Sequence, residues 1–413
     1  MASSVTGDDT VRLQYEAYPY PPRDPADEKK RLITGSPSNL AEINHYIFAG
    51  RRDFGKPFRV LVAGGGTGDA AIMLAQQLAD EGGAATIIYL DLSRSSAKIA
   101  RARAEARGLT NIEFVTGSIL DLEEIADAPF DYIDCCGVLH HLADPPAGLC
   151  ALRNVLADGG GMGLMVYAPY GRTGVYQVQS LLRLIGDHEP AHRVEQARSL
   201  LRQLPSTNWF RRNDLVADHI KAGDAGIYDL LLHSRDRAYT VPELARMVAD
   251  ADLRIVSFIE PIRYDPAAFI GDTALLEKFD RLEWIDRCAA AELLTGNLKT
   301  HVFYVVKAGR PSPAVATTKD DDLRPVLVGL DQAAAALGTN RRMTVDLDGI
   351  KLSIPFSDRA LEILALMDGR RTIGAIRQAM NASRRPMTGD EFDQAFSDLF
   401  GTLNGLNLAF LRI

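Results

Sequence analysis

The sequence has no long apolar run, and this absence excludes the simplest membrane-spanning architecture. No stretch of it approaches the roughly eighteen apolar residues that a transmembrane helix needs. The N-terminal residues Met1–Asp9 also lack the basic region and following apolar region of a secretory signal peptide. We therefore expect a cytoplasmic protein that does not interact with a membrane.

Cysteine is scarce as well. The chain has four cysteines, Cys135, Cys136, Cys150 and Cys288, and three of them fall in apolar segments. Their positions predict reduced, buried thiols. Neither these cysteines nor any run of His, Asp or Glu has metal-ligand spacing, so we expect no metal site.

Positive charge is in short supply. The 46 basic residues are outnumbered by 54 acidic ones, for a net charge of −8. This balance disfavours general attraction to nucleic acid, and no nucleic-acid partner is expected. A chain of 413 residues with 46% hydrophobic residues can form a core and exceeds one typical domain. The oligomeric state cannot be predicted from these features.

What the sequence does contain is an apolar strand, residues 59–63, that runs into a glycine-rich turn at residues 64–68. Glycine lets the backbone turn tightly and approach a ligand, because no Cβ stands in the way. A second apolar strand, residues 86–90, ends on Asp91, where a carboxylate could hold two ribose hydroxyls. The combination predicts a cofactor that contains adenosine.

The spacing of the glycines distinguishes two such cofactors. A dinucleotide site needs G-x-G-x-x-G, which places a pyrophosphate on the helix N-terminus. Here Gly64, Gly66 and Gly68 give G-x-G-x-G, and Asp69 follows at the start of the helix. A carboxylate there would repel a pyrophosphate but suits the cationic end of S-adenosylmethionine. On these residues the chain resembles the class I S-adenosylmethionine-dependent methyltransferases.

Three later segments agree with this resemblance. Residues 111–118 resemble the third strand and the turn beside the adenine, and residues 159–167 the fifth strand. Residues 130–142 resemble the fourth strand and end in GVLHHL, a run frequent in methyltransferases of the ubiquinone and menaquinone type. The chain departs from the family at Val62 and Ser118, where relatives usually carry an acid.

The resemblance implies a set of cofactor-binding residues. Asp69 would face the amino-acid end of the cofactor, Asp91 would hold the ribose, and the backbone at Gly137 and Val138 would line the methionine side. The full expected set is Gly64, Gly65, Gly66, Thr67, Gly68, Asp69, Asp91, Leu92, Gly117, Ser118, Ile119, Gly137 and Val138.

The candidate catalytic residues are His140, His141 and Tyr170. An imidazole where the fourth strand opens into the pocket could act as a base at neutral pH. Alternatively, a histidine in this motif caps the next helix or packs under the sheet. Tyr170 and Arg172 follow the fifth strand near the expected pocket mouth, and a surface role is equally open to them.

The expected fold class is α/β, with a Rossmann-like seven-stranded methyltransferase sheet, helical insertions and a small C-terminal α+β domain. Residues 1–55 would form an N-terminal lid and helical segment, with Tyr15–Pro22 extended rather than helical and residues 38–48 at helical spacing. It would cover the cofactor or pack against the sheet. Residues 56–310 would form the methyltransferase domain. Within it we expect a helical cap at about 168–240 and an antiparallel strand pair at 253–259 and 301–306.

Residues 311–323 read as a polar linker, and residues 324–413 carry a pattern of their own. A hairpin over 343–354 has Asp348-Gly349 as its turn. Helices would start after Ser357 and near Asp390, and a strand would end the chain. This layout resembles the winged-helix-like C-terminal appendages of bacterial methyltransferases, including protein-lysine methyltransferases.

Three functions follow from the resemblance. The first is methyl transfer to O, N or C of a small-molecule metabolite. The second is methylation of a protein side chain such as lysine, with the C-terminal domain recognising the protein. The third is a regulatory protein that binds S-adenosylmethionine without transferring the methyl group.

Overall fold

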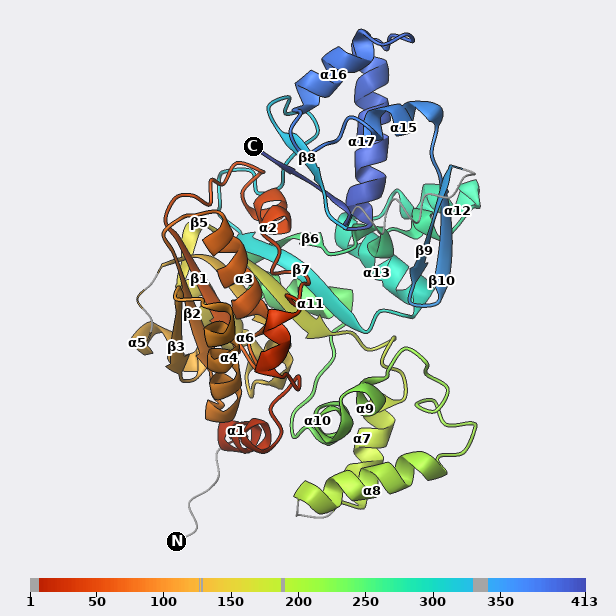
Figure 1. Ribbon diagram of the computed structural model, residues 1–413. Helices are drawn as coiled ribbons and strands as arrows, with labels where there is room; N and C mark the ends of the chain where they lie inside the picture. Colours follow the sequence, from red (N-terminus) through yellow and green to blue (C-terminus); the bar gives the residue numbers. More distant parts are fainter. Residues whose placement is uncertain (1–6, 126, 128, 187–189, 330–340) are drawn as a thin grey trace.

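The computed structural model describes residues 7–125, 127, 129–186, 190–329 and 341–413, and its centre is a seven-stranded sheet (Figure 1). The strands are ordered β3-β2-β1-β4-β5-β7-β6. β1 to β5 are parallel, and β7 is antiparallel to both of its neighbours. The bounds are β1 Phe58–Ala63, β2 Ala85–Asp91, β3 Ile112–Thr116, β4 Phe130–Cys136, β5 Leu156–Tyr167, β6 Leu253–Phe258 and β7 Thr300–Lys307. The predicted Rossmann-like sheet is confirmed.

Helices cover both faces of this sheet. One face packs against α2 (Leu40–Ile47), α3 (Asp69–Asp80) and α4 (Arg94–Arg107). The other packs against α6 (Pro145–Asn154), α11 (Val241–Asp250) and α13 (Trp284–Thr295). The winding reverses between β1 and β4, which opens a crevice at the carboxyl ends of these two strands.

The N-terminal segment runs across those carboxyl ends. It begins with α1 (Gly7–Ala17), so the prediction that Tyr15–Pro22 is extended is wrong for Tyr15, Glu16 and Ala17. Val11 and Tyr15 face the interior one helical turn apart, and this spacing outweighs the effect of the later prolines. The helix ends two residues before Pro19, as expected before a proline. Tyr18 then stacks on Tyr228 at 5.0 Å between ring centroids.

The expected cap at about 168–240 is helical and has an apolar core of its own. It comprises α7 (Val175–Leu184), α8 (Pro190–Gln203), α9 (Asp218–Lys221) and α10 (Gly223–Ile227). A π-helical turn, Tyr228–Leu232, follows directly. Such turns are rare and are found frequently at functional sites. A second insertion carries α12 (Thr273–Phe279) ahead of α13.

In the C-terminal region, the described residues 324–329 and 341–413 form two small strand pairs and three helices. Its elements are β8 Arg324–Leu327, β9 Arg342–Leu347, β10 Ile350–Pro355, α15 Asp358–Leu364, α16 Ile373–Asn381, α17 Gly389–Gly405 and β11 Ala409–Arg412. The predicted hairpin is present with Gly349 at φ +92°, and Ser357 caps α15. β8, which pairs with β11, was not predicted. The winged-helix resemblance stays a prediction.

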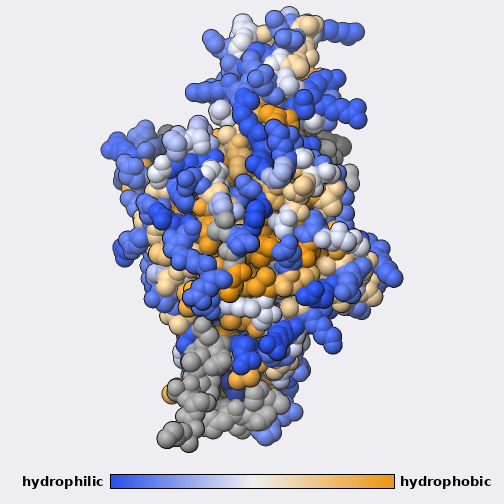
Figure 2. Space-filling model, turned by 90° about the vertical axis from the view of Figure 1, so that its left-hand side faces the viewer, coloured by the Kyte–Doolittle hydropathy of each residue, from blue (hydrophilic) through white to orange (hydrophobic). Residues whose placement is uncertain are grey.

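Residues 311–323 pack closely against the rest of the chain. The Ala316 backbone N–H donates to the His45 carbonyl at 2.8 Å, and Leu323 is buried. None of the described helices has both the length and the apolar character needed to cross a bilayer. On the face drawn in Figure 2, hydrophobic residues gather in the middle and hydrophilic residues surround them.

Candidate functional site

A cavity of about 410 Å³ lies at the carboxyl ends of β1, β2, β4 and β5, beneath the N-terminal segment. This volume falls within the range of small-molecule sites. Most of the predicted cofactor residues line it: Gly64, Gly65, Gly66, Asp69, Asp91, Leu92, Gly117, Ser118, Ile119, Gly137 and Val138.

The glycine turn is tightly packed against neighbouring side chains. A Cβ on Gly64 would lie 2.3 Å from Val138 Cγ2, and one on Gly65 would lie 2.2 Å from the Tyr89 ring. Two predicted residues of the turn do not line the cavity. Thr67 Oγ1 donates to the Pro21 carbonyl at 2.7 Å, and a Cβ on Gly68 would lie 2.8 Å from Ala100 Cβ. These two residues serve packing and the attachment of the N-terminal segment.

Asp91 has the geometry expected of a residue that binds a ribose. One carboxylate oxygen accepts from the Gly66 N–H at 2.7 Å, and the other accepts from the Ser93 N–H at 2.8 Å. Each oxygen therefore keeps lone pairs for a ligand hydroxyl. Burial raises the pKa of Asp91. With Gly117–Ile119 lining the adenine side, these residues fit the expected adenosine group.

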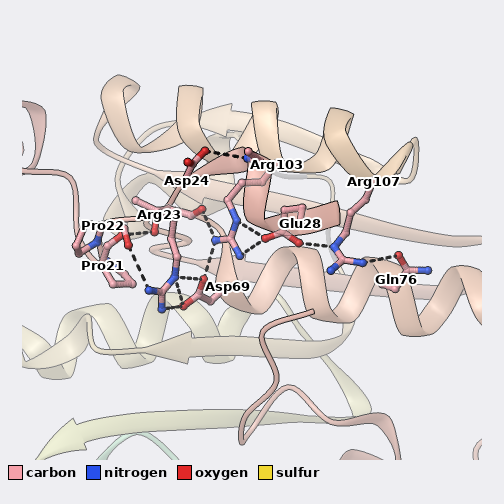
Figure 3. A network of polar contacts seen from close by, with 11 residues as sticks. Pro21, Pro22, Arg23, Asp24, Glu28, Asp69, Gln76, Arg103 and Arg107 are labelled. Atoms are coloured by element: carbon pink, nitrogen blue, oxygen red, sulfur yellow. Dashed lines mark hydrogen bonds and ion pairs between the residues drawn. The ribbon is translucent and has the colours of Figure 1, made fainter. Parts of the chain in front are cut away.

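Asp69 is held by arginines (Figure 3). Its carboxylate lies 2.6 Å from Arg23 Nη2 and 2.6 Å from Arg103 Nη1. Burial alone would raise the pKa of Asp69, but hydrogen bonds from these two guanidinium groups hold it below its usual value. Arg103 is buried and also pairs with Glu28 at 2.6 Å. The charge of Asp69 is thus already balanced, and the residue anchors the N-terminal segment through Arg23.

The other end of the cavity holds a cluster of hydrogen-bonding side chains, which we call the acceptor cluster: Tyr15, His141, Tyr167, Asp229 and His233. The Tyr15 hydroxyl donates to Asp229 Oδ1 at 3.1 Å, and the Tyr167 hydroxyl donates to Oδ2 at 3.3 Å. The His141 and His233 rings stack at 3.7 Å. Burial raises the pKa of Asp229.

Backbone contacts of Arg235 determine the tautomers of both histidines in this cluster. His141 Nδ1 lies 2.7 Å from the Arg235 carbonyl, which can only accept, so Nδ1 carries the hydrogen and Nε2 keeps its lone pair. The Arg235 N–H instead donates to His233 Nδ1 at 3.0 Å. His233 Nε2 therefore carries the hydrogen and donates to the Tyr15 oxygen at 3.3 Å. Burial lowers the pKa of His233 well below its usual value, so this ring is neutral.

Ligand atoms of His141, Asp229 and His233 lie within 4.8 Å of one another, close enough to surround a metal ion. Spacing along the sequence did not reveal this group, because folding brings His141 next to Asp229 and His233, which lie about ninety residues further along the chain. The expectation of no metal stays a prediction. The tautomers favour a hydrogen-bonded network over a metal centre, since His233 directs no lone pair at Asp229.

Only one of the three predicted catalytic residues lines the cavity, and that residue is His141. His140 is buried next to the Tyr167 ring at 4.0 Å, and neither of its ring nitrogens has a hydrogen-bond partner. Burial lowers its pKa well below the usual value. Tyr170 is half-buried outside the cavity. Asp229 and His233 were missed, although an acid inside the apolar run YDLLLH was a usable signal.

The family model described as "Methyltransferase domain" matches residues 61–162. The uncharacterized protein syc1184_c of Synechococcus sp. is 30% identical over 335 residues, which covers 78% of this chain and 76% of that protein. The tRNA 5-carboxymethoxyuridine methyltransferase of Escherichia coli (strain K12) is 36% identical over 114 residues, or 27% of this chain and 41% of that protein.

Solved structures share the fold. PKMT2 from Rickettsia typhi has a TM-score of 0.64 at 16% identity, covering 95% of this chain and 78% of that one. The same protein has also been solved in complex with AdoHcy, with a TM-score of 0.60. With the sheet order, the glycine turn and Asp91, these similarities show that the chain belongs to the class I S-adenosylmethionine-dependent methyltransferases.

Proposed function

We propose that this methyltransferase acts on a nucleophilic oxygen or nitrogen of a small-molecule metabolite, with His141 as the base. The observation that carries the proposal is the Nε2 lone pair of His141, kept free by the Arg235 carbonyl at the wall of the cavity. S-adenosylmethionine, when bound, supplies a methyl group on an already activated sulfonium. The protein must then align the acceptor and remove one proton.

The acceptor cluster suits both tasks. His141 Nε2 takes the proton of a hydroxyl or ammonium group. Asp229, held by two tyrosine hydroxyls, orients that group and favours the resulting imidazolium. His141, Asp229 and His233 are buried, and the exclusion of water from these side chains strengthens the interactions.

The contacts of the N-terminal segment support its role as a lid that excludes water from the reacting groups. Tyr15 and Tyr20 line the cavity, and Arg23 ties the segment to Asp69 at the start of α3. The Glu16 carboxylate also accepts from the backbone N–H groups of Arg94 and Ser95, at 2.6 and 3.1 Å. A covered cavity of about 410 Å³ that must also hold the cofactor favours a small acceptor.

A second candidate is methylation of a protein side chain. Two tyrosines and a carboxylate suit an ammonium group, and the fold of PKMT2 extends over 95% of this chain, including the C-terminal region. The lysine side chain is narrow enough to reach a buried site. The relative that acts on tRNA matches only 27% of this chain, which gives less support to an RNA substrate.

The test is an assay of methyl transfer from radiolabelled S-adenosylmethionine into cell extract that has been separated into small-molecule, protein and RNA pools. Label in the small-molecule pool supports the proposal, and label in the protein pool instead supports the second candidate. The His141→Gln variant is assayed in parallel, and it should transfer no labelled methyl group. We expect transfer to continue after chelator treatment, and loss that a divalent ion restores would establish a metal at the acceptor cluster.

A further inference from the structure

The first strand lacks an acid at a position where relatives of this family usually carry one. That position is Val62 on β1, and Asp134 on the neighbouring strand β4 stands in register with it. Residues in register on parallel strands direct their side chains to the same face, and the strands lie about 4.8 Å apart. Val62 and Asp134 both line the cavity. A carboxylate is therefore present at this wall, one strand away from its usual position.

Asp134 is a buried acid without a cationic partner among the described residues. Its side chain is 1% exposed, and its carboxylate accepts from Ser38 Oγ at 2.7 Å. Only that hydroxyl and the Cys136 thiol favour its charged form, whereas burial raises its pKa to about 6. A buried carboxylate paired only with neutral donors is costly unless a ligand supplies a positive charge.

We propose that Asp134 binds the ammonium group at the amino-acid end of S-adenosylmethionine and replaces the acid missing at Val62. The alternative residue, Asp69, already has Arg23 and Arg103 as partners. The acceptor cluster is built from α1, the cap, the segment after β4 and the last residue of β5, whereas Asp134 faces Ser38 ahead of α2. The inference rests on the function proposed above only in placing the cofactor in the same cavity.

Two ligands test this assignment by calorimetric titration. S-adenosylhomocysteine has the amino-acid end, and 5′-methylthioadenosine has the same nucleoside and sulfur without it. Asp134→Asn should weaken S-adenosylhomocysteine binding about tenfold to a hundredfold, as expected for a lost hydrogen bond between charged groups. Binding of 5′-methylthioadenosine should stay within about twofold. The matched control is Asp131→Asn, an acid on the same strand that accepts from the Arg59 N–H and does not line the cavity.

A second variant moves the carboxylate back to the first strand. Val62→Asp combined with Asp134→Val should restore most of the lost affinity for S-adenosylhomocysteine. The assignment is overturned if Asp134→Asn weakens both ligands equally, or neither, or if the folded exchange variant regains nothing. Since no acceptor takes part in these titrations, a failure of the proposed substrate class would leave their outcome unchanged.

Discussion

The two ends of the cavity differ in where their residues come from. The cofactor end is lined by residues near the ends of β1, β2, β3 and β4 and in the turns that follow them, so short runs of consecutive residues form most of it. The acceptor cluster is built from side chains of α1, the segment after β4, the last residue of β5, and a π-helical turn in the cap with the residue that follows it. Local sequence thus determines most of the first end, whereas tertiary packing determines the second and also places Asp134 beside Val62 at the first.

The largest effect should come from the acceptor cluster. His141→Gln removes the free Nε2 lone pair, and we expect kcat to fall about 10²- to 10⁴-fold, the usual range for a lost general base. Affinity for S-adenosylhomocysteine should not change. Tyr170→Phe is the control, since Tyr170 lies outside the cavity. Equal activity of both variants would show that His141 is not the base.

A substitution at the cofactor end should instead mainly lower the affinity for the cofactor. Asp91→Ala removes a carboxylate that is positioned by the Gly66 and Ser93 N–H groups. Cofactor binding should weaken by about 2–3 kcal/mol, because charge-assisted hydrogen bonds to ribose are lost. Glu113→Ala, at an exposed position of β3, is the matched control for calorimetry. A normal affinity in Asp91→Ala would contradict the ribose assignment.

The N-terminal segment joins the two ends, so its anchor should affect turnover more than stability. Arg23→Ala breaks a partly exposed ion pair with Asp69, which should cost less than about 1 kcal/mol of unfolding free energy. We expect turnover to fall about tenfold, because a loosened lid admits water to the reacting groups. Lys30→Ala, which breaks the exposed pair with Asp27, is the control. A large drop in Tm with unchanged turnover would instead indicate a purely packing role.

The smallest effect is a dependence of cofactor affinity on pH. Burial raises the pKa of Asp134 to about 6, so the free protein gains a proton there as pH falls through that value. An ammonium ligand prefers the carboxylate, so affinity for S-adenosylhomocysteine should rise with pH up to about 6 and then level off. The titratable groups that interact electrostatically with Asp134 are Glu42, Tyr132, Cys135, Cys136 and Tyr304.

Titrations at several pH values, with wild type and Asp134→Asn side by side, test this dependence. Asp91, whose pKa is also raised, contributes equally to both proteins. The difference between the two curves of affinity against pH therefore measures the contribution of Asp134. Parallel curves would show that Asp134 does not contribute to the pH dependence.

Much of the fold could be predicted because its signals are local. The glycine turn, Asp91, the Asp348-Gly349 turn and the Ser357 cap each depend on a few neighbouring residues. Asp229 and His233 could not be placed, because nothing near them in sequence shows that the cap returns to His141. The compensation between Val62 and Asp134 was missed for the same reason, since register between strands seventy residues apart exists only in the folded sheet.

The position of Tyr15 should determine the order in which the two substrates bind. It belongs to the segment that covers the glycine turn, and its hydroxyl also holds Asp229. If the segment moves aside as a lid to admit S-adenosylmethionine, it withdraws Tyr15 from the acceptor cluster, and only its return restores the complete cluster for the second substrate. The two substrates should consequently bind in a compulsory order, with the nucleoside first and its demethylated product leaving last.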